Sequence, residues 1–145
     1  METILIVCGI ELGGSTANIV VLAGTADDFN VVDTGITKLE INDSESAPDV
    51  ISFYDSFHSF IRNHNVQKIG IKRRSPKAKG KYASGPLTFK MEGLIQLSKD
   101  AEVVLIPPNT IAAKLRKDPP PKAKIYKYQT EAYETAYAFL RIENA

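Results

Sequence analysis

The sequence predicts a single-domain α/β protein, spanning residues 1–145, with a five-stranded mixed sheet and helices packed on its faces. Three observations support this fold class. The chain has 145 residues, which is a usual size for one domain. Three apolar runs joined by short turns come first, as in an antiparallel meander. Helix-like and strand-like segments then alternate, which is typical of a sheet covered by helices.

The first three expected strands cover residues 3–10, 18–24 and 29–41. Residues 3–10 are β-branched and apolar without interruption, as in a strand that is buried on both faces. A Gly-Gly-Ser turn leads from this segment to the second strand. Because the connections are short, we expect neighbouring strands to run antiparallel.

Helices and strands alternate in the rest of the chain. An apolar stripe from Val50 to Ile61 recurs at helical spacing, and a proline just before it suits a first helical turn. Residues 73–86 are polar, basic and rich in turn formers, which predicts a loop. The remaining expected elements are strands over 66–72 and 101–107, helices over 87–99, 110–117 and 129–142, and a proline linker over 118–124. The predicted order is β-β-β-α-β-α-β-α.

Composition favours a soluble cytoplasmic protein with no membrane partner. Hydrophobic residues make up 43% of the chain, which is enough for a core, and the single cysteine, Cys8, excludes an intrachain disulfide. No apolar run approaches the roughly 20 residues of a membrane span. The N-terminus lacks the basic start and apolar core of a signal peptide. We expect Cys8 in the core, and His58 and His64 on the surface.

Charge is strongly segregated along the chain, although the net charge is only +1. Residues 1–67 carry ten acidic and two basic side chains, whereas residues 68–127 carry fifteen basic and four acidic ones. Such asymmetry favours a polyanionic partner, and nucleic acid is the leading candidate. The alternative is that the charges only solvate exposed faces.

A basic cluster in the middle of the chain is the first candidate site. Its members are Lys72, Arg73, Arg74, Lys77, Lys79 and Lys81, with Tyr82 beside them. Lysines and arginines in such a run can contact phosphates without reading sequence. The tyrosine can stack on an unpaired base. The cluster therefore predicts a nucleic-acid-binding loop, with a solvated flexible loop as the alternative.

Glu11 marks the second candidate site, in the stretch Cys-Gly-Ile-Glu-Leu-Gly-Gly-Ser that begins at Cys8. A carboxylate in line with a buried strand is unfavourable without a partner. Two interpretations follow from the residues. Either the glycine turn cradles a phosphate, or Glu11 helps to hold a metal ion.

Three motifs resemble the ribonuclease H-like superfamily, in particular the RuvC-type Holliday-junction resolvases. The stretch Gly-Ile-Glu-Leu-Gly-Gly is similar to their first-strand motif, and residues 106–117 resemble their strand–proline–helix segment. Residues 131–140 are similar to their final helix, which carries two acids three positions apart. The order of elements also resembles a small family of uncharacterised bacterial proteins with this RuvC-like pattern.

The resemblance implies a Mg²⁺-dependent phosphodiesterase that acts on nucleic acid. It implies Glu11, Glu131 and Glu134 as catalytic carboxylates, and Glu11 and Glu134 as metal ligands. Glu92, near the start of the helix after the basic loop, is the candidate for a further metal ligand. Such carboxylates would hold one or two Mg²⁺ ions that activate water and stabilise the leaving oxygen. Glu131 and Glu134 are also explained more simply, as acids favoured near a helix N-terminus.

One departure from the family pattern is serious. Lys72 stands where the family has its second acid, after the fourth expected strand. A lysine repels a metal ion, so Lys72 can instead form a structural ion pair with Glu11. The alternative function is therefore a catalytically inactive ribonuclease H-like protein that binds nucleic acid or a protein partner.

A third alternative comes from the sugar kinase, actin and heat-shock chaperone superfamily, whose phosphate-binding motif resembles the Glu11 stretch. Those proteins clamp ATP between two copies of the fold, and 145 residues hold only one. This leaves a nucleotide or phosphate binder that uses the Gly-Gly-Ser-Thr turn. The sequence leaves open whether the chain forms a homodimer, and whether the nucleic acid is DNA or RNA.

Overall fold

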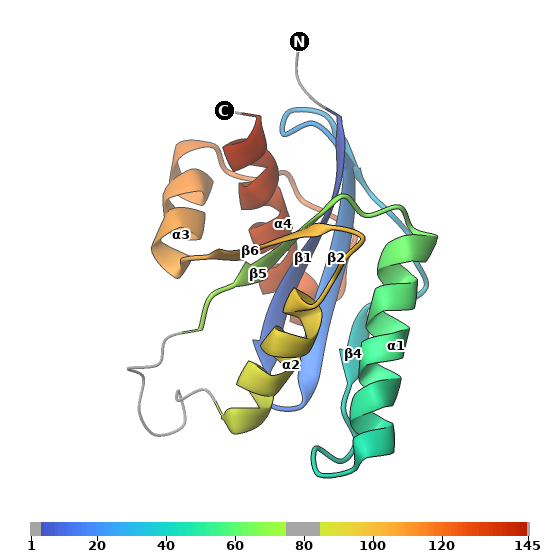
Figure 1. Cartoon of the computed structure of the whole chain (residues 1–145). Helices are drawn as coiled ribbons and strands as arrows, with labels where there is room; N and C mark the ends of the chain where they lie inside the picture. Colours follow the sequence, from blue (N-terminus) through green and yellow to red (C-terminus); the bar gives the residue numbers. More distant parts are fainter. Residues whose placement is uncertain (1–3, 75–84, 145) are drawn as a thin grey trace.

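The computed structural model describes residues 4–74 and 85–144, and in this part of the chain one mixed sheet lies between two helical layers (Figure 1). The path of paired strands is β3-β2-β1-β5-β6, and β4 also pairs with β2. The strands are β1 (Leu5–Gly13), β2 (Thr16–Gly24), β3 (Phe29–Val31), β4 (Lys38–Glu40), β5 (Lys68–Lys72) and β6 (Glu102–Ile106). The helices are α1 (Ala47–Asn63), α2 (Pro86–Gln96), α3 (Pro108–Lys117) and α4 (Thr130–Glu143), which a 3-10 turn, η2 (Lys127–Gln129), precedes.

The sheet is mixed because its two halves are connected differently. A hairpin joins β1 to β2, so these strands are antiparallel, and β3 and β4 extend the antiparallel half. Helical connections lead to β5 and β6, which run parallel to β1. The predicted antiparallel meander and the alternation of helices and strands after it are confirmed. No helix among the described residues is long and apolar enough to cross a membrane.

The predicted strand over 29–41 is two short strands, so the sheet formed by the described residues has six strands rather than five. Gly35 breaks the segment, because its φ of 76° lies in the left-handed region that favours glycine. Its N–H donates to the Asp33 side chain, and the Thr34 hydroxyl donates to the Ile36 carbonyl. These local bonds replace ladder bonds to β2, which runs past a gap between β3 and β4.

Side chains on β1 alternate between two apolar layers, because successive residues of a strand point to opposite faces. Cys8, Ile10 and Leu12 are fully buried on the face that α1 and α2 cover. Leu5 and Val7 are buried against α4 on the other face. The core position predicted for Cys8 is confirmed, and this burial raises the pKa of its thiol.

The first predicted helix, α1, is confirmed, but the predicted position of one of its histidines is wrong. Ser46 caps the helix by accepting the backbone N–H of Asp49. His58 was expected on the surface, yet it is 4% exposed, and its Nε2 lies 2.9 Å from the Leu94 carbonyl oxygen. Because α2 packs against α1 at this point, that side of α1 is covered. His64, at the end of the helix, is half-buried.

Two glycines set how closely α4 approaches the sheet. A Cβ on Gly9 of β1 would clash with the backbone carbonyl of Ala132, and a Cβ on Gly70 of β5 would lie 2.6 Å from the Phe139 ring. Any larger residue would therefore hold the helix away from the sheet. Helix α4 therefore lies directly against β1 and β5.

Candidate functional site

A row of polar side chains crosses the sheet on the face covered by α4. Asn18 of β2 pairs with Glu11 of β1 on one side and with Lys38 of β4 on the other. The parallel register of β1 and β5 aligns Ile10 with Ile71, which places Lys72 beside Glu11. The row therefore reads Lys38, Asn18, Glu11 and Lys72, and we call it the polar row.

The two glycines show that the row faces α4. Gly9 and Gly70 contact α4, and Glu11 and Lys72 lie two positions further along the same strands. Residues two apart on a strand share a face. The carboxyl ends of β1 and β5 thus present a carboxylate and an ammonium, side by side, to the first turn of α4.

Each charge in the centre of the row has a different partner. Asn18 donates from Nδ2 to Glu11 Oε1 at 2.8 Å, and Glu11 Oε2 lies over Gly13, toward the end of the strand. Lys72 Nζ donates to Glu131 Oε1 of α4 at 2.6 Å. The predicted Glu11–Lys72 ion pair is therefore corrected to a Lys72–Glu131 pair. The length and flexibility of the lysine side chain let it cross from β5 to the helix.

The Lys72–Glu131 pair is partly open to water. The side chains are 29% and 52% exposed, so the pair adds at most about 1 kcal/mol to stability. Its consequence is electrostatic. The ammonium neutralises Glu131, one of the three carboxylates that the resemblance implies as catalytic.

Glu134 lies on the far side of α4 from Glu11. Ala132 and Ala136 both contact Gly9, so the direction midway between them points at β1. Because successive helix residues are rotated by about 100°, Glu134 points about 180° away from that direction. The helical spacing of Glu131 and Glu134 was predicted, but it does not bring Glu134 back to the first strand.

Glu92 is on α2, the helix layer that covers the opposite face of the sheet from the polar row. Burial raises the pKa of its carboxyl, and the positive charge of Arg74 opposes that shift. Glu92 therefore lies within electrostatic reach of the basic cluster rather than in the polar row.

The residues present do not fit a magnesium site. Within residues 4–74 and 85–144, no group of three or more acidic, histidine or cysteine side chains could hold a metal ion. Glu11 is bonded to an amide, Glu131 is bonded to an ammonium, and Glu134 points away. A cation at this site would compete with the Lys72 ammonium for the Glu131 carboxylate.

The glycine turn after Glu11 has a conformational explanation. Gly13 pairs with Thr16 across the hairpin, which leaves a two-residue loop of Gly14 and Ser15. Gly14 has φ 57°, as required at the first central position of a tight hairpin turn. The geometry of the hairpin turn thus explains why position 14 is a glycine, without a bound phosphate.

The basic cluster continues directly from the polar row. Lys72 ends β5, and Arg73 is exposed while its backbone N–H donates to the Ile106 carbonyl at 2.9 Å. Arg74 follows at the edge of the described residues. The other predicted members, Lys77, Lys79, Lys81 and Tyr82, lie outside the described residues. The first three cations of the cluster are therefore at the same end of the sheet as Glu11.

A second aromatic and basic segment, which is not among the predicted sites, overlaps the linker expected over 118–124. Lysines and tyrosines are interleaved in Lys122-Ala-Lys-Ile-Tyr-Lys-Tyr128, and this alternation was the available signal. Tyr126 and Tyr128 are 63% and 41% exposed. Lys38 Nζ of the polar row lies 5.1 Å from the centre of the Tyr128 ring. The segment thus adjoins one end of the polar row.

Residues 5–139 match the family described as "Protein of unknown function (DUF3010)". The chain belongs to this family. No curated protein matches its sequence. The sequence predicted a resemblance to an uncharacterised family with a RuvC-like pattern. The match confirms that the chain belongs to a family of unknown function.

Two solved structures of RuvC are similar to this DUF3010 protein. The Thermus thermophilus RuvC structure superposes with a TM-score of 0.70 and 12% identity, covering 97% of this chain and 98% of that one. T. thermophilus RuvC in complex with a Holliday junction substrate gives a TM-score of 0.67 with the same identity and coverage. The ribonuclease H-like fold predicted from the sequence is therefore confirmed. At this identity, the likeness extends to the fold alone.

Proposed function

We propose that this DUF3010 protein binds nucleic acid at the carboxyl ends of β1 and β5, without metal-dependent cleavage. The bond between Lys72 Nζ and Glu131 Oε1, 2.6 Å long, carries the proposal. It puts an ammonium in the polar row, where the resemblance to RuvC-type resolvases implies a carboxylate. The Lys72 ammonium occupies a carboxylate that a divalent cation would need, so phosphate binding falls to the exposed cations that follow β5.

The neighbouring cations support a phosphate-binding role. Arg73 is exposed just after β5, and Arg74 lies near the Glu92 carboxyl, as its effect on that group's pKa indicates. Guanidinium and ammonium groups contact phosphates without reading base sequence. The structure of T. thermophilus RuvC, which has a similar fold, has been solved with a Holliday junction substrate, so branched DNA is a reasonable first probe.

Glu11 has a positioning role in this proposal. Its carboxylate accepts the Asn18 amide and lies beside Lys72 in the register of β1 and β5. Its negative charge repels phosphate from the hairpin turn. A phosphate is then expected on the Arg73 side of Lys72.

A binding and cleavage experiment tests the proposal. Fluorescence anisotropy is measured with labelled four-way junction, duplex and single-stranded DNA, and with the RNA equivalents, over a series of salt concentrations. We expect binding whose log affinity falls linearly with log salt concentration. In parallel, labelled substrates are incubated with Mg²⁺ or Mn²⁺, and intact substrate is expected.

The outcomes separate the two parts of the proposal. Products that require both the metal and Glu11 would overturn the non-catalytic assignment and restore the nuclease. Absence of binding to every one of the nucleic acids at low salt would overturn the nucleic-acid function itself.

A further inference from the structure

Two exposed tyrosines form a flat aromatic surface just before α4. The rings of Tyr126 and Tyr128 are stacked, with centroids 5.4 Å apart and planes 5° from parallel. Tyr126 is 63% exposed, so much of the ring that does not contact Tyr128 remains in solvent. Tyrosine is enriched at interaction sites, because it combines an apolar ring with a polar hydroxyl. We call these two residues the tyrosine pair.

The tyrosine pair is held in place by bonds to the sheet. Gln129 is 6% exposed; its Nε2 donates to the Ile19 carbonyl at 2.9 Å, and its Oε1 accepts the Tyr126 backbone N–H at 3.0 Å. The Tyr128 hydroxyl is hydrogen-bonded to the Thr37 hydroxyl. The backbone of the pair is therefore preorganised against β2, which reduces the entropy lost when a ligand binds.

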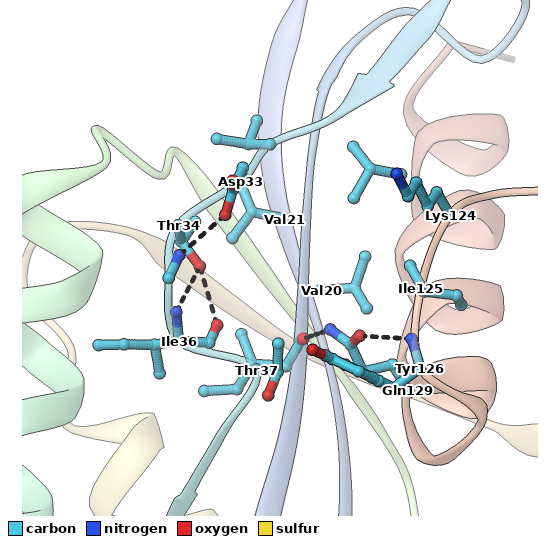
Figure 2. Close-up of a pocket in the computed structure, with 14 residues that line it drawn as sticks. Val20, Val21, Asp33, Thr34, Ile36, Thr37, Lys124, Ile125, Tyr126 and Gln129 are labelled. Carbon is cyan, nitrogen blue, oxygen red and sulfur yellow. Dashed lines mark hydrogen bonds between the residues drawn. The ribbon is translucent and has the colours of Figure 1, made fainter.

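A cavity of about 650 Å³ lies beside Tyr126, at the gap between β3 and β4 (Figure 2). Its floor is β2 at Ile19 to Val21, and its walls are the 32–37 connection and the 124–126 segment. Figure 2 shows Tyr126 and Gln129 at one side of the cavity and Ile36 and Thr37 at the other. The cavity gives a group stacked near Tyr126 a place next to the sheet edge.

The charge around the tyrosine pair is positive. Lys122, Lys124 and Lys127 are exposed in the same segment, and Lys38 lies over the Tyr128 ring. Two acids are close: Glu40 pairs with Lys38 at 3.7 Å, and Asp33 lines the cavity. The Asp33 carboxylate already accepts the Gly35 N–H. Four lysines thus outnumber two engaged carboxylates, which favours an anionic ligand.

The tyrosine pair is continuous with the proposed phosphate site. Lys38 belongs to the polar row, whose members sit on adjacent strands from β4 to β5. Three inter-strand steps of about 4.8 Å separate Lys38 from Lys72, or roughly 14 Å. A nucleic acid that contacts Arg73 at one end of the row can therefore reach the tyrosine pair at the other.

We propose that the tyrosine pair stacks an unpaired base of a single-stranded segment whose phosphates contact Lys124 and Lys127. The inference rests on the proposed nucleic-acid function and names its substrate class: nucleic acid with a single-stranded end or branch. A base offers a flat π-face to Tyr126, and each flanking phosphate offers an anion to a lysine. A duplex, whose bases are already stacked, has no free base face for the tyrosines.

The test compares how tightly two variants of Tyr126 bind single-stranded and duplex nucleic acid. Tyr126→Ala removes the stacking ring, and Tyr126→Phe keeps it. Affinity for a labelled oligothymidylate, measured by fluorescence anisotropy, is expected to fall about 5- to 150-fold for Tyr126→Ala and to stay near wild type for Tyr126→Phe. Affinity for a blunt duplex is expected to change little in either variant. Ile51→Ala, at an exposed position on α1, is the matched control.

The wild-type protein also supplies a direct readout, because it has no tryptophan. Tyrosine emission should be quenched by the oligothymidylate in wild type. It should be quenched less in Tyr126→Phe/Tyr128→Phe, which lacks the two tyrosines expected to contact the base. Equal affinity of wild type and Tyr126→Ala for the oligothymidylate, with salt-dependent duplex binding intact, would overturn this inference and leave the proposed function standing. No binding of any nucleic acid would overturn both. If the oligothymidylate binds weakly and an acidic peptide binds tightly, and if this peptide binding is lost in Tyr126→Ala, the tyrosine pair would be reassigned to a protein partner.

Discussion

Lys72 Nζ and Glu131 Oε1, 2.6 Å apart, join the carboxyl end of β5 to the first turn of α4. The same strand is joined to the last turn of the helix by Lys68 and Glu143, at 2.8 Å. Two lysine–glutamate pairs thus hold α4 along β5. The pair at the N-terminus of α4 stands in the polar row, and the other pair is remote from it, so the two can be compared directly.

Replacing Lys72 tests whether its ammonium prevents metal binding. Lys72→Glu removes the positive charge and adds a carboxylate beside Glu11 and Glu131, so Mg²⁺ or Mn²⁺ affinity should rise. Lys72→Gln, which removes only the charge, should give an intermediate affinity. Isothermal titration calorimetry of the three proteins measures the order. Tight metal binding by the wild type, not improved by Lys72→Glu, would place the lysine outside any metal site.

Arg73 is the described cation best placed to contact phosphate, because it is exposed and directly follows the polar row. Arg73→Ala should weaken duplex binding and reduce the slope of log affinity against log salt concentration by about 0.9 if one phosphate contact is lost. Lys99→Ala is the control, because Lys99 is exposed near the start of β6, at the opposite end of the parallel strands. Equal slopes for Arg73→Ala and wild type would remove Arg73 from the interface.

The order of elements could be predicted because apolar periodicity reports which residues are buried. The break in the strand over 29–41 could not, since it depends on how Gly35 and its neighbours bond locally instead of to β2. Only part of the polar row could be predicted. The sequence marks Glu11 and Lys72 as unusual, but it does not show which partner each side chain takes. That choice depends on the strand register and on the rotation of α4, which turns Glu131 toward Lys72 and Glu134 away from Gly9.

Substitutions of glycine should separate close packing from helix propensity. Gly9→Ala should destabilise the protein by about 1–3 kcal/mol, because its Cβ meets the backbone of α4, which cannot move aside without lifting the helix. Gly93→Ala should stabilise it by about 0.5–1 kcal/mol, because nothing lies within 4 Å of a Cβ there and alanine favours the helix. Urea unfolding measures both. A neutral Gly9→Ala would mean that α4 does not rest directly on β1.

The Lys68 pairs should make stability fall at alkaline pH. Hydrogen bonds to Glu143 and Glu102 raise the pKa of the Lys68 ammonium in the folded protein. Folding therefore favours the protonated lysine: this stabilisation is complete below the unfolded-state pKa of about 10.4 and is lost as pH rises through the higher folded-state pKa.

Lys68→Gln should be slightly less stable than wild type at pH 7 and should lose less stability on going to strongly alkaline pH. Urea unfolding at both pH values measures the difference, and Lys99→Gln, at an exposed lysine on a loop, should show the wild-type decline. An identical decline in Lys68→Gln and wild type would show that the Lys68 pairs contribute nothing to this part of the pH dependence.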